Sequence, residues 1–201
     1  GKNSKIIKIT PAGKAELFAG GGRNGKDGVG NEAGFRDAEG IAIDSADNLY
    51  LADGQRIRKI SPDAVVTTIA GTTTAAIKDG DRQTAAFWNL ENIAIDNKGT
   101  IYVTDYAQAG ANTGEYCIRK VSADGYVSTI KDGTNILVFR YPRGLACDAA
   151  GNLYVCCNAS HCVRKISPEG IITTVAGQCD KTVLNSVYKE GPVATAVLTA
   201  P

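Results

Sequence analysis

The sequence has little of what most enzymes use for catalysis. Its 201 residues include one histidine, one tryptophan and no methionine. No GxSxG elbow, P-loop or HExxH motif occurs, which excludes the commonest signatures of hydrolases, nucleotide-binding enzymes and zinc proteases. No apolar run approaches the ~20 residues of a membrane span. A formal net charge of +1 gives no reason to expect a nucleic acid or an anionic membrane as partner.

What the sequence does contain is a repeat. Three near-identical segments, GIAIDSADNLYLAD, NIAIDNKGTIYVTD and GLACDAAGNLYVCC, begin 52 residues apart at Gly40, Asn92 and Gly144. Each is followed by a second element of the type IRKISPDAVVTTIAG, and IIKITPAGKAELFAG near the start of the chain is a fourth copy of that element alone. A period near 50 residues, filled with short β-rich runs, is typical of propellers and other stacked arrays.

Each unit predicts four antiparallel strands joined by short turns, because aromatic and β-branched runs alternate with turn-forming residues. Helical signals are nearly absent. A four-stranded sheet of this size cannot bury both faces alone, so neighbouring sheets must pack on one another, and radial closure also protects the sheet edges. The first strand of each unit is a short apolar run that suits a buried strand. We therefore expect the innermost strands to be Ile41–Ile43, Ile93–Ile95 and Leu145–Cys147.

The patterns GIAxDxxGNLYxAD and RKIxPxGxxTTxAG, with linkers such as EGPVATAVLTAP, resemble NHL repeats. This resemblance implies an all-β, six-bladed propeller of four-stranded antiparallel blades. Residues 1–201 would then form a single propeller domain of about three and a half blades: half blade 1–20, blades 38–71, 90–130 and 142–177, and a linker to the next blade over 178–201. A ring of six would need roughly 100 more residues, so we expect the chain to be part of a longer protein.

The connections predict a binding face. In a four-stranded meander, the loops from strand two to three and from strand four to the next unit lie on one side. These loops are long and irregular here, whereas the remaining turns are short and uniform; the long segments are Gly20–Glu39, Gly71–Glu91, Tyr106–Tyr116, Lys131–Arg143 and Gly177–Pro201. Variable loops on one side of a regular scaffold are typical of binding surfaces.

Several residues are candidates for ligand contact on this face. Those just before the inner strands should ring the channel mouth, and aromatic residues of the long loops could stack on a ligand. The candidate ligand-binding residues are Glu39, Glu91, Asn92, Arg143, Trp88 and Tyr116.

The same mouth suggests a metal site. Asp53 and Asp105 end their second strands near this face, and several oxygen ligands around one opening suit Ca²⁺. The candidate metal ligands are Glu39, Glu91, Asn92, Asp53 and Asp105. The arrangement is similar to that of gluconolactonase and senescence-marker propellers, in which Glu, Asn and Asp hold a catalytic divalent ion. Alternatively, the two aspartates cap the following turns and Glu39 pairs with Arg143. We expect no cofactor, with Ca²⁺ as the candidate ion for this mouth.

Six cysteines are more than a typical cytosolic domain uses. Cys157 and Cys162 flank a short connection between strands two and three, so we predict that they face each other and form a disulfide. A disulfide would indicate an oxidising, extracytoplasmic compartment, either periplasmic or secreted. The alternatives are buried free thiols and a zinc site that includes His161.

The sequence leaves two functions open. The first is a binding scaffold that recognises a protein or a small ligand, for example a carbohydrate, on the face with the long loops, without chemistry of its own. The second is a divalent-metal-dependent propeller hydrolase or lactonase with its ion at the channel mouth. They differ in whether the carboxylates of the mouth bind an ion.

Overall fold

The computed structural model describes residues 4–106, 115–179, 190–192, 196 and 198. Apart from two single 3-10 turns, η1 (Gly30–Glu32) and η2 (Asn158–Ser160), its elements are strands. The all-β prediction is confirmed. No helix in these residues is long and apolar enough to cross a membrane.

Three consecutive four-stranded antiparallel sheets form the body of the molecule. Blade A contains β4 (Ala38–Ile43), β5 (Leu49–Asp53), β6 (Arg56–Ile60) and β7 (Val65–Ala70). Blade B contains β8 (Leu90–Ile95), β9 (Ile101–Tyr106), β10 (Glu115–Val121) and β11 (Val127–Thr129). Blade C contains β15 (Pro142–Cys147), β16 (Leu153–Cys157), β17 (Cys162–Ile166) and β18 (Ile172–Gly177).

The remaining strands lie at the edges of the blades. The N-terminal pair β1 (Lys5–Ile9) and β2 (Ala15–Gly20) forms a separate two-stranded sheet. β3 (Gly28–Val29) pairs with β7 and covers the outer edge of blade A. β14 (Val138–Arg140) pairs with β10, and β12 (Lys131–Asp132) forms a small hairpin with β13 (Asn135–Ile136).

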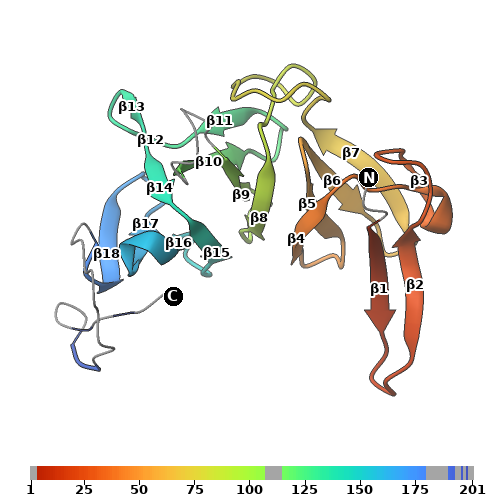
Figure 1. Cartoon of the computed structure of the whole chain (residues 1–201), viewed down its shortest axis with the longest axis horizontal. Helices are drawn as coiled ribbons and strands as arrows, with labels where there is room; N and C mark the ends of the chain where they lie inside the picture. Colours follow the sequence, from red (N-terminus) through yellow and green to blue (C-terminus); the bar gives the residue numbers. More distant parts are fainter. Residues whose placement is uncertain (1–3, 107–114, 180–189, 193–195, 197, 199–201) are drawn as a thin grey trace.

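The blades are arranged side by side along an arch (Figure 1), with their first strands in contact. β4 packs against β8, and β8 packs against β15. These strands contain the three predicted innermost segments, so the predicted radial order is confirmed. The close contact needs a small residue, because a Cβ at Gly40 would lie 2.5 Å from the carbonyl oxygen of Glu91.

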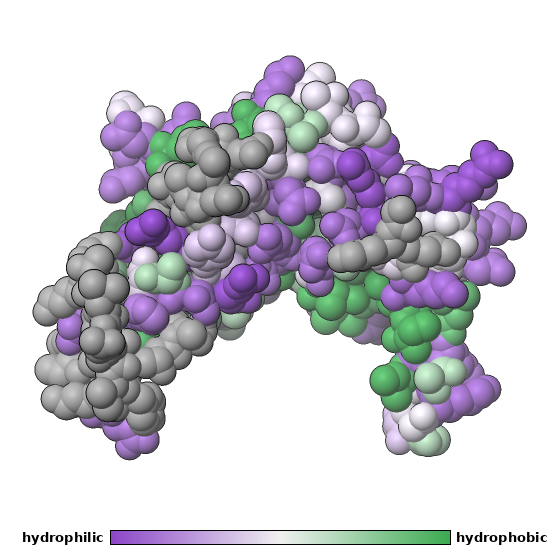
Figure 2. Space-filling model, viewed as in Figure 1, coloured by the Kyte–Doolittle hydropathy of each residue, from purple (hydrophilic) through white to green (hydrophobic). Residues whose placement is uncertain are grey.

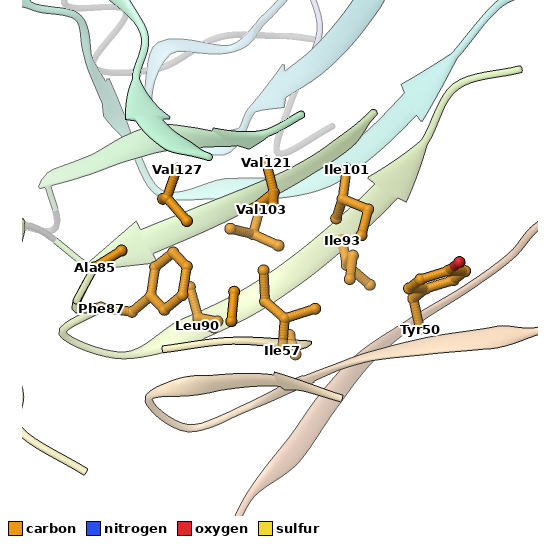
Figure 3. Packing of buried hydrophobic residues seen from close by; sticks show 12 residues of the cluster. Tyr50, Ile57, Ala85, Phe87, Leu90, Ile93, Ile101, Val103, Val121 and Val127 are labelled. Carbon is orange, nitrogen blue, oxygen red and sulfur yellow. The ribbon is translucent and has the colours of Figure 1, made fainter. Parts of the chain in front are cut away.

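The hydrophobic core lies between the sheets. Three clusters fill the spaces between β1–β2 and blade A, between blades A and B, and between blades B and C. Each contains a buried phenylalanine from the segment that leads into an inner strand: Phe35, Phe87 and Phe139. Figure 3 shows Phe87 packed among Leu90, Val103 and Val127. Full burial of one such side chain contributes about 1.5–3 kcal/mol, so each interface between blades depends on the linker before it.

The inner strand of blade A departs from the prediction of a buried strand. Ile41 is 53% exposed and Ile43 57% exposed, whereas Ile93, at the position of Ile41 in blade B, is only 6% exposed. The reason is that β8 is covered by β4, while β4 faces a sheet of only two strands. A groove of about 540 Å³ remains there, lined by Ile7, Ile41 and Ile43 among others. Figure 2 shows hydrophobic surface gathered between β1–β2 and blade A.

At one end of the blades, short turns join the first strand to the second, and an aspartate side chain closes each turn by hydrogen bonds. Asp44 accepts hydrogen bonds from the N–H groups of Ala46 and Asn48 (both 2.9 Å) and from the Tyr50 hydroxyl (3.1 Å). The turn in blade C that begins at Asp148 repeats these bonds. Burial raises the pKa of Asp44, but the hydrogen bonds from Asn48, Ala46 and Tyr50 outweigh it and leave the pKa below its usual value. The aspartate and tyrosine columns of the repeat are therefore structural.

Candidate functional site

The long connections lie together on one face. The N–H of Gly54, in the connection between β5 and β6, donates to the carbonyl oxygen of Asp37 (3.2 Å), and Leu90 donates to the carbonyl oxygen of Gly54 (2.8 Å). In blade C, Asn158 donates in the same way to the carbonyl oxygen of Tyr141 (3.1 Å). The connections from strand two to three and those between blades are thus hydrogen-bonded to each other. We call this side of the molecule the loop face.

Three predicted site residues follow one another along the rim formed by the inner strands. Glu39, Glu91 and Arg143 occupy β4, β8 and β15, which are neighbours in this order. The side-chain amide of Asn92 links two of these strands by donating to the carbonyl oxygen of Pro142 (3.2 Å). Glu39 and Arg143 are exposed, and the described residues contain no ion pair between them.

Glu91 is held by a tyrosine cluster. The Tyr116 hydroxyl donates to Glu91 Oε1 (2.6 Å), and the Tyr116 ring lies 5.1 Å from the ring of Tyr106 and 6.3 Å from that of Tyr141. The Arg143 guanidinium stacks over Tyr141, 6.0 Å from the ring centre. Burial, followed by the Glu91 carboxylate, raises the pKa of Tyr116 above its usual range. The hydroxyl therefore stays protonated and remains the donor to Glu91.

The tyrosine that faces solvent is not the predicted one. Tyr116 belongs to β10 and is only 5% exposed, so its ring is not free to stack on a ligand as its predicted loop position suggested. Tyr141 is 38% exposed and has a backbone φ of 46°, a conformation that is uncommon outside glycine and is often found at functional sites. In the sequence, Tyr141 was marked only by its position two residues before Arg143, which was already a candidate for the channel mouth.

Trp88 is half-buried between blades A and B. Its N–H donates to Asp105 Oδ1 (2.9 Å), and its carbonyl oxygen accepts from Gln55 Nε2 (2.9 Å). These bonds fix the backbone of the linker at this point, so the tryptophan takes part in the contact between blades.

Asp53 is buried in an ion pair and does not line the rim. Asp53 Oδ1 accepts the N–H groups of Arg36 and Asp37 (2.7 and 2.8 Å), and Oδ2 accepts from Arg58 Nη1 (2.8 Å). The other guanidinium nitrogen of Arg58 bonds to Asp27 (2.7 Å). Both oxygens of Asp53 are therefore occupied inside the protein.

Asp105 repeats this arrangement in blade B. It accepts the N–H groups of Trp88 and Asn89 (both 2.9 Å) and pairs with Arg119 (2.9 Å), which in turn bonds to Asp79 (3.1 Å). Burial raises the pKa of Asp105 to about 6, although Arg119 and the two N–H donors act in the opposite direction. The carboxylate is thus ionised at neutral pH, as the ion pair requires.

The five predicted metal ligands do not come together. Asp53 and Asp105 are committed to arginines, and Glu91 to Tyr116. Within the described ranges, no group of three or more His, Cys, Asp or Glu side chains is placed to hold a metal ion. The donor set therefore does not fit the proposed Ca²⁺ site, and the interpretation of the two aspartates as structural residues agrees with the geometry.

The predicted disulfide between Cys157 and Cys162 is wrong. Cys162 bonds to Cys179, with the Cα atoms 5.3 Å apart. Cys157 does lie opposite Cys162 in the strand register, but its sulfur lies 3.7 Å from the carbonyl oxygen of Val155 on its own strand. β17 is a middle strand with neighbours on both sides. Because Cys162 also pairs in register with Gly177 of β18, the chain beyond β18 brings Cys179 within reach.

Comparison with known proteins bears on the fold. The NHL repeat family matches residues 139–166, which cover β14 to β17. The solved structure of a streptogramin B lyase is similar to this chain, with a TM-score of 0.55 and 15% sequence identity over 90% of this chain and 50% of that one. The chain thus spans about half the length of that structure. No curated protein matches the sequence. The recurring repeat, the matched NHL segment and the radially packed four-stranded sheets together support a β-propeller built from NHL-type repeats.

Proposed function

We propose that this propeller is a binding scaffold that recognises a protein or a small ligand on the loop face. The observation that carries the proposal is the contrast between its two ends. One end has short, near-identical turns closed by their own aspartates. The other has long connections of unequal length that bond to each other across blades. A rigid framework with variable loops on one side is typical of recognition surfaces.

The side chains around Tyr141 on the loop face suit binding. Tyr141 presents an aromatic ring, Arg143 stacks on it, and Glu91 and Tyr116 form a hydrogen-bonded pair beside them. An aromatic ring beside charged and hydroxyl groups can contact the side chains of a peptide or the ring of a sugar. The Cys162–Cys179 disulfide supports a location in an oxidising compartment, periplasmic or secreted.

The alternative, a metal-dependent hydrolase or lactonase, has less support. It needs several free carboxylate oxygens around one opening, whereas Asp53, Asp105 and Glu91 are hydrogen-bonded within the protein. The likeness to a streptogramin B lyase, at 15% identity, supports a shared fold and does not transfer that activity.

The test compares two exposed tyrosines on opposite ends of the blades. Tyr141 belongs to the loop face, and Tyr126, 52% exposed, belongs to the short turn before β11. The immobilised chain is screened against panels of peptides and oligosaccharides, and each hit is remeasured with Tyr141→Asn and with Tyr126→Asn. Asparagine suits Tyr141 because it tolerates a positive φ, and the same substitution at Tyr126 keeps the comparison matched. We expect Tyr141→Asn to weaken binding about ten-fold or more and Tyr126→Asn to leave it unchanged.

Equal losses in the two variants would contradict the proposal. So would hydrolysis of an ester or lactone that needs a divalent ion and disappears in Glu91→Gln, because that result would favour the hydrolase.

A further inference from the structure

A polar cavity opens on the loop face of blade A, away from the tyrosine cluster. Its volume is about 280 Å³. Three segments supply its walls: the linker before the blade (Gly25 and Arg36), the end of the β5–β6 connection with the first residue of β6 (Gln55 and Arg56), and the linker after the blade (Thr72 and Thr73). The size suits a small molecule or a single functional group.

Only blade A combines the two arginines of this cavity. Arg36 shares its column with Trp88 and Arg140, whereas Arg56 shares its column with Cys117 and Cys162 and so departs from the repeat. The arginines of the repeat consensus, Arg58 and Arg119, are instead fully buried in ion pairs. Blade A therefore has arginine in both columns, and neither of the other two blades does. The blade fold does not require this pair, since blades B and C form without it.

Neither arginine has a carboxylate partner in the described part of the chain. One guanidinium nitrogen of Arg36 bonds to Gln55 Oε1, and one of Arg56 bonds to the carbonyl oxygen of Gly25 (2.8 Å). A guanidinium has five N–H donors, so most donors of both remain for a ligand. Asp53 also borders the cavity, but both its oxygens accept hydrogen bonds from the protein, one from Arg58.

The protein holds Arg56 in place before any ligand arrives. Gly25 has a φ of +70°, and a Cβ at this position would lie 3.0 Å from Arg56 Nη1. The absence of a side chain therefore lets the guanidinium lie directly against the backbone. A binding group fixed in this way loses less conformational entropy when it binds.

We propose that this cavity binds the anionic group of a small ligand, a carboxylate or a phosphate, with Arg36 and Arg56 as its charged contacts. Guanidinium groups match the oxygen pairs of both anions, and the hydroxyl of the neighbouring Thr73 can add a neutral donor. The inference rests on the proposed binding function and specifies the ligand chemistry of one part of the loop face.

The experiment titrates the full chain with inorganic phosphate and, separately, with acetate, followed by NMR chemical shifts at constant ionic strength. We expect saturable shift changes for residues around Arg56. The affinity obtained from them should fall about ten-fold or more in Arg36→Gln and in Arg56→Gln. Arg140→Gln is the matched control. Arg140 occupies the column of Arg36 in blade C, but blade C has Cys162 where blade A has Arg56. Gly25→Ser should displace Arg56 and weaken binding while Arg56 itself is retained.

Tighter binding of phosphate would identify a phosphorylated ligand, and tighter binding of acetate a carboxylate ligand; either supports the proposal. Shifts that do not saturate, or that Arg140→Gln reduces equally, would overturn it. The proposed function has a separate readout: a ligand that depends on Tyr141 but not on Arg36 or Arg56 would leave the binding scaffold intact and refute only the anion site.

Discussion

In blades A and B, a carboxylate from the linker before the blade reaches the third strand, whereas in blade C a sulfur from the segment after the blade does so. Asp27 contacts Arg58 and Thr68, and Asp79 makes the equivalent contacts in blade B. In blade C the third strand is reached by Cys179, which lies 3.4 Å from Arg164 Nε and 3.5 Å from the Thr174 hydroxyl.

The second carboxylate is also replaced. Asp53 ends the second strand of blade A, Asp105 is the last residue but one of the second strand of blade B, and Cys157 occupies the equivalent position in blade C. In blade C, Cys157 thus replaces the aspartate of the second strand, and Cys179, from the segment after the blade, is covalently bonded to the third strand through Cys162.

The arginines of the third strands also differ in exposure. Arg58 and Arg119 are fully buried, so each needs carboxylates to offset the loss of its water. Arg164 is half-buried, and water can solvate part of its charge. The comparison teaches that one scaffold can tie its connecting segments to the third strand by buried ion pairs, as in blades A and B, and by a disulfide, as in blade C.

The largest expected loss of stability comes from breaking a buried arginine–aspartate ion pair. Arg119→Met should reduce the free energy of unfolding by about 3–5 kcal/mol, because it leaves Asp105 buried without its counter-ion. Arg164→Met, the same change in blade C, should cost only about 1 kcal/mol because the site is half-buried. Urea denaturation measures both.

Equal losses in the two variants would refute the distinction between the blades. The double variant Arg119→Met with Asp105→Leu sharpens the test, since removal of both charges should restore part of the stability lost in Arg119→Met.

The second largest expected loss of stability comes from removing the Cys162–Cys179 disulfide. Cys179→Ser should reduce stability by about 3 kcal/mol, the value for a loop of this order of length; the bonded cysteines are 17 residues apart. Protein purified without reductant and then denatured should titrate four thiols, those of Cys117, Cys147, Cys156 and Cys157. Cys179→Ser should titrate five, because it releases Cys162.

Cys156→Ser serves as the control, since it removes a half-buried thiol and leaves the disulfide in place. Peptide mapping that joins Cys157 to Cys162, or a count of six thiols in the unmodified chain, would contradict the assignment.

The smallest expected effect concerns the aspartate turns that the blades share, and it appears in the pH dependence of stability. Hydrogen bonds from Asn152, Tyr154 and Ala150 hold the pKa of Asp148 below its usual value of 3.8. A carboxyl whose pKa is lowered by folding adds stability above its unfolded pKa and loses it as the pH falls through the folded pKa. We therefore expect Asp148 to titrate below pH 3.8 by NMR, and Asp148→Asn to make the loss of stability below about pH 4 less steep.

Asp44→Asn, in the equivalent turn of blade A, should act in the same direction. Asp132→Asn provides a control in the exposed β12–β13 hairpin. A decline in stability that is identical in all three variants would show that the turns do not contribute to it.

Much of the fold could be predicted from local patterns. The 52-residue spacing, the alternating strands and the short turns all depend on contacts within one unit, so they recur wherever the unit recurs. The loop face followed from strand direction alone. The candidate site was less predictable: Glu91 and Arg143 were correctly placed on the rim, but Tyr141 and the Arg36–Arg56 cavity were missed. The signal for the cavity lay in a comparison of equivalent columns, where only blade A combines an arginine at the position of Arg36 with one at the position of Arg56.

The sequence by itself determined which residues form strands and in what order the blades follow, because each unit carries its own hydrophobic pattern and turn residues. Tertiary structure alone decided three other matters: that Asp53 and Asp105 turn inward to arginines, that Cys162 bonds across β18 rather than to Cys157, and that Ile41 and Ile43 stay exposed. Each depends on which neighbour lies on the second side of a strand or sheet. A pattern read along one segment specifies its own pleat and hairpin partner, whereas burial and pairing on the far side are set by chain that lies distant in the sequence.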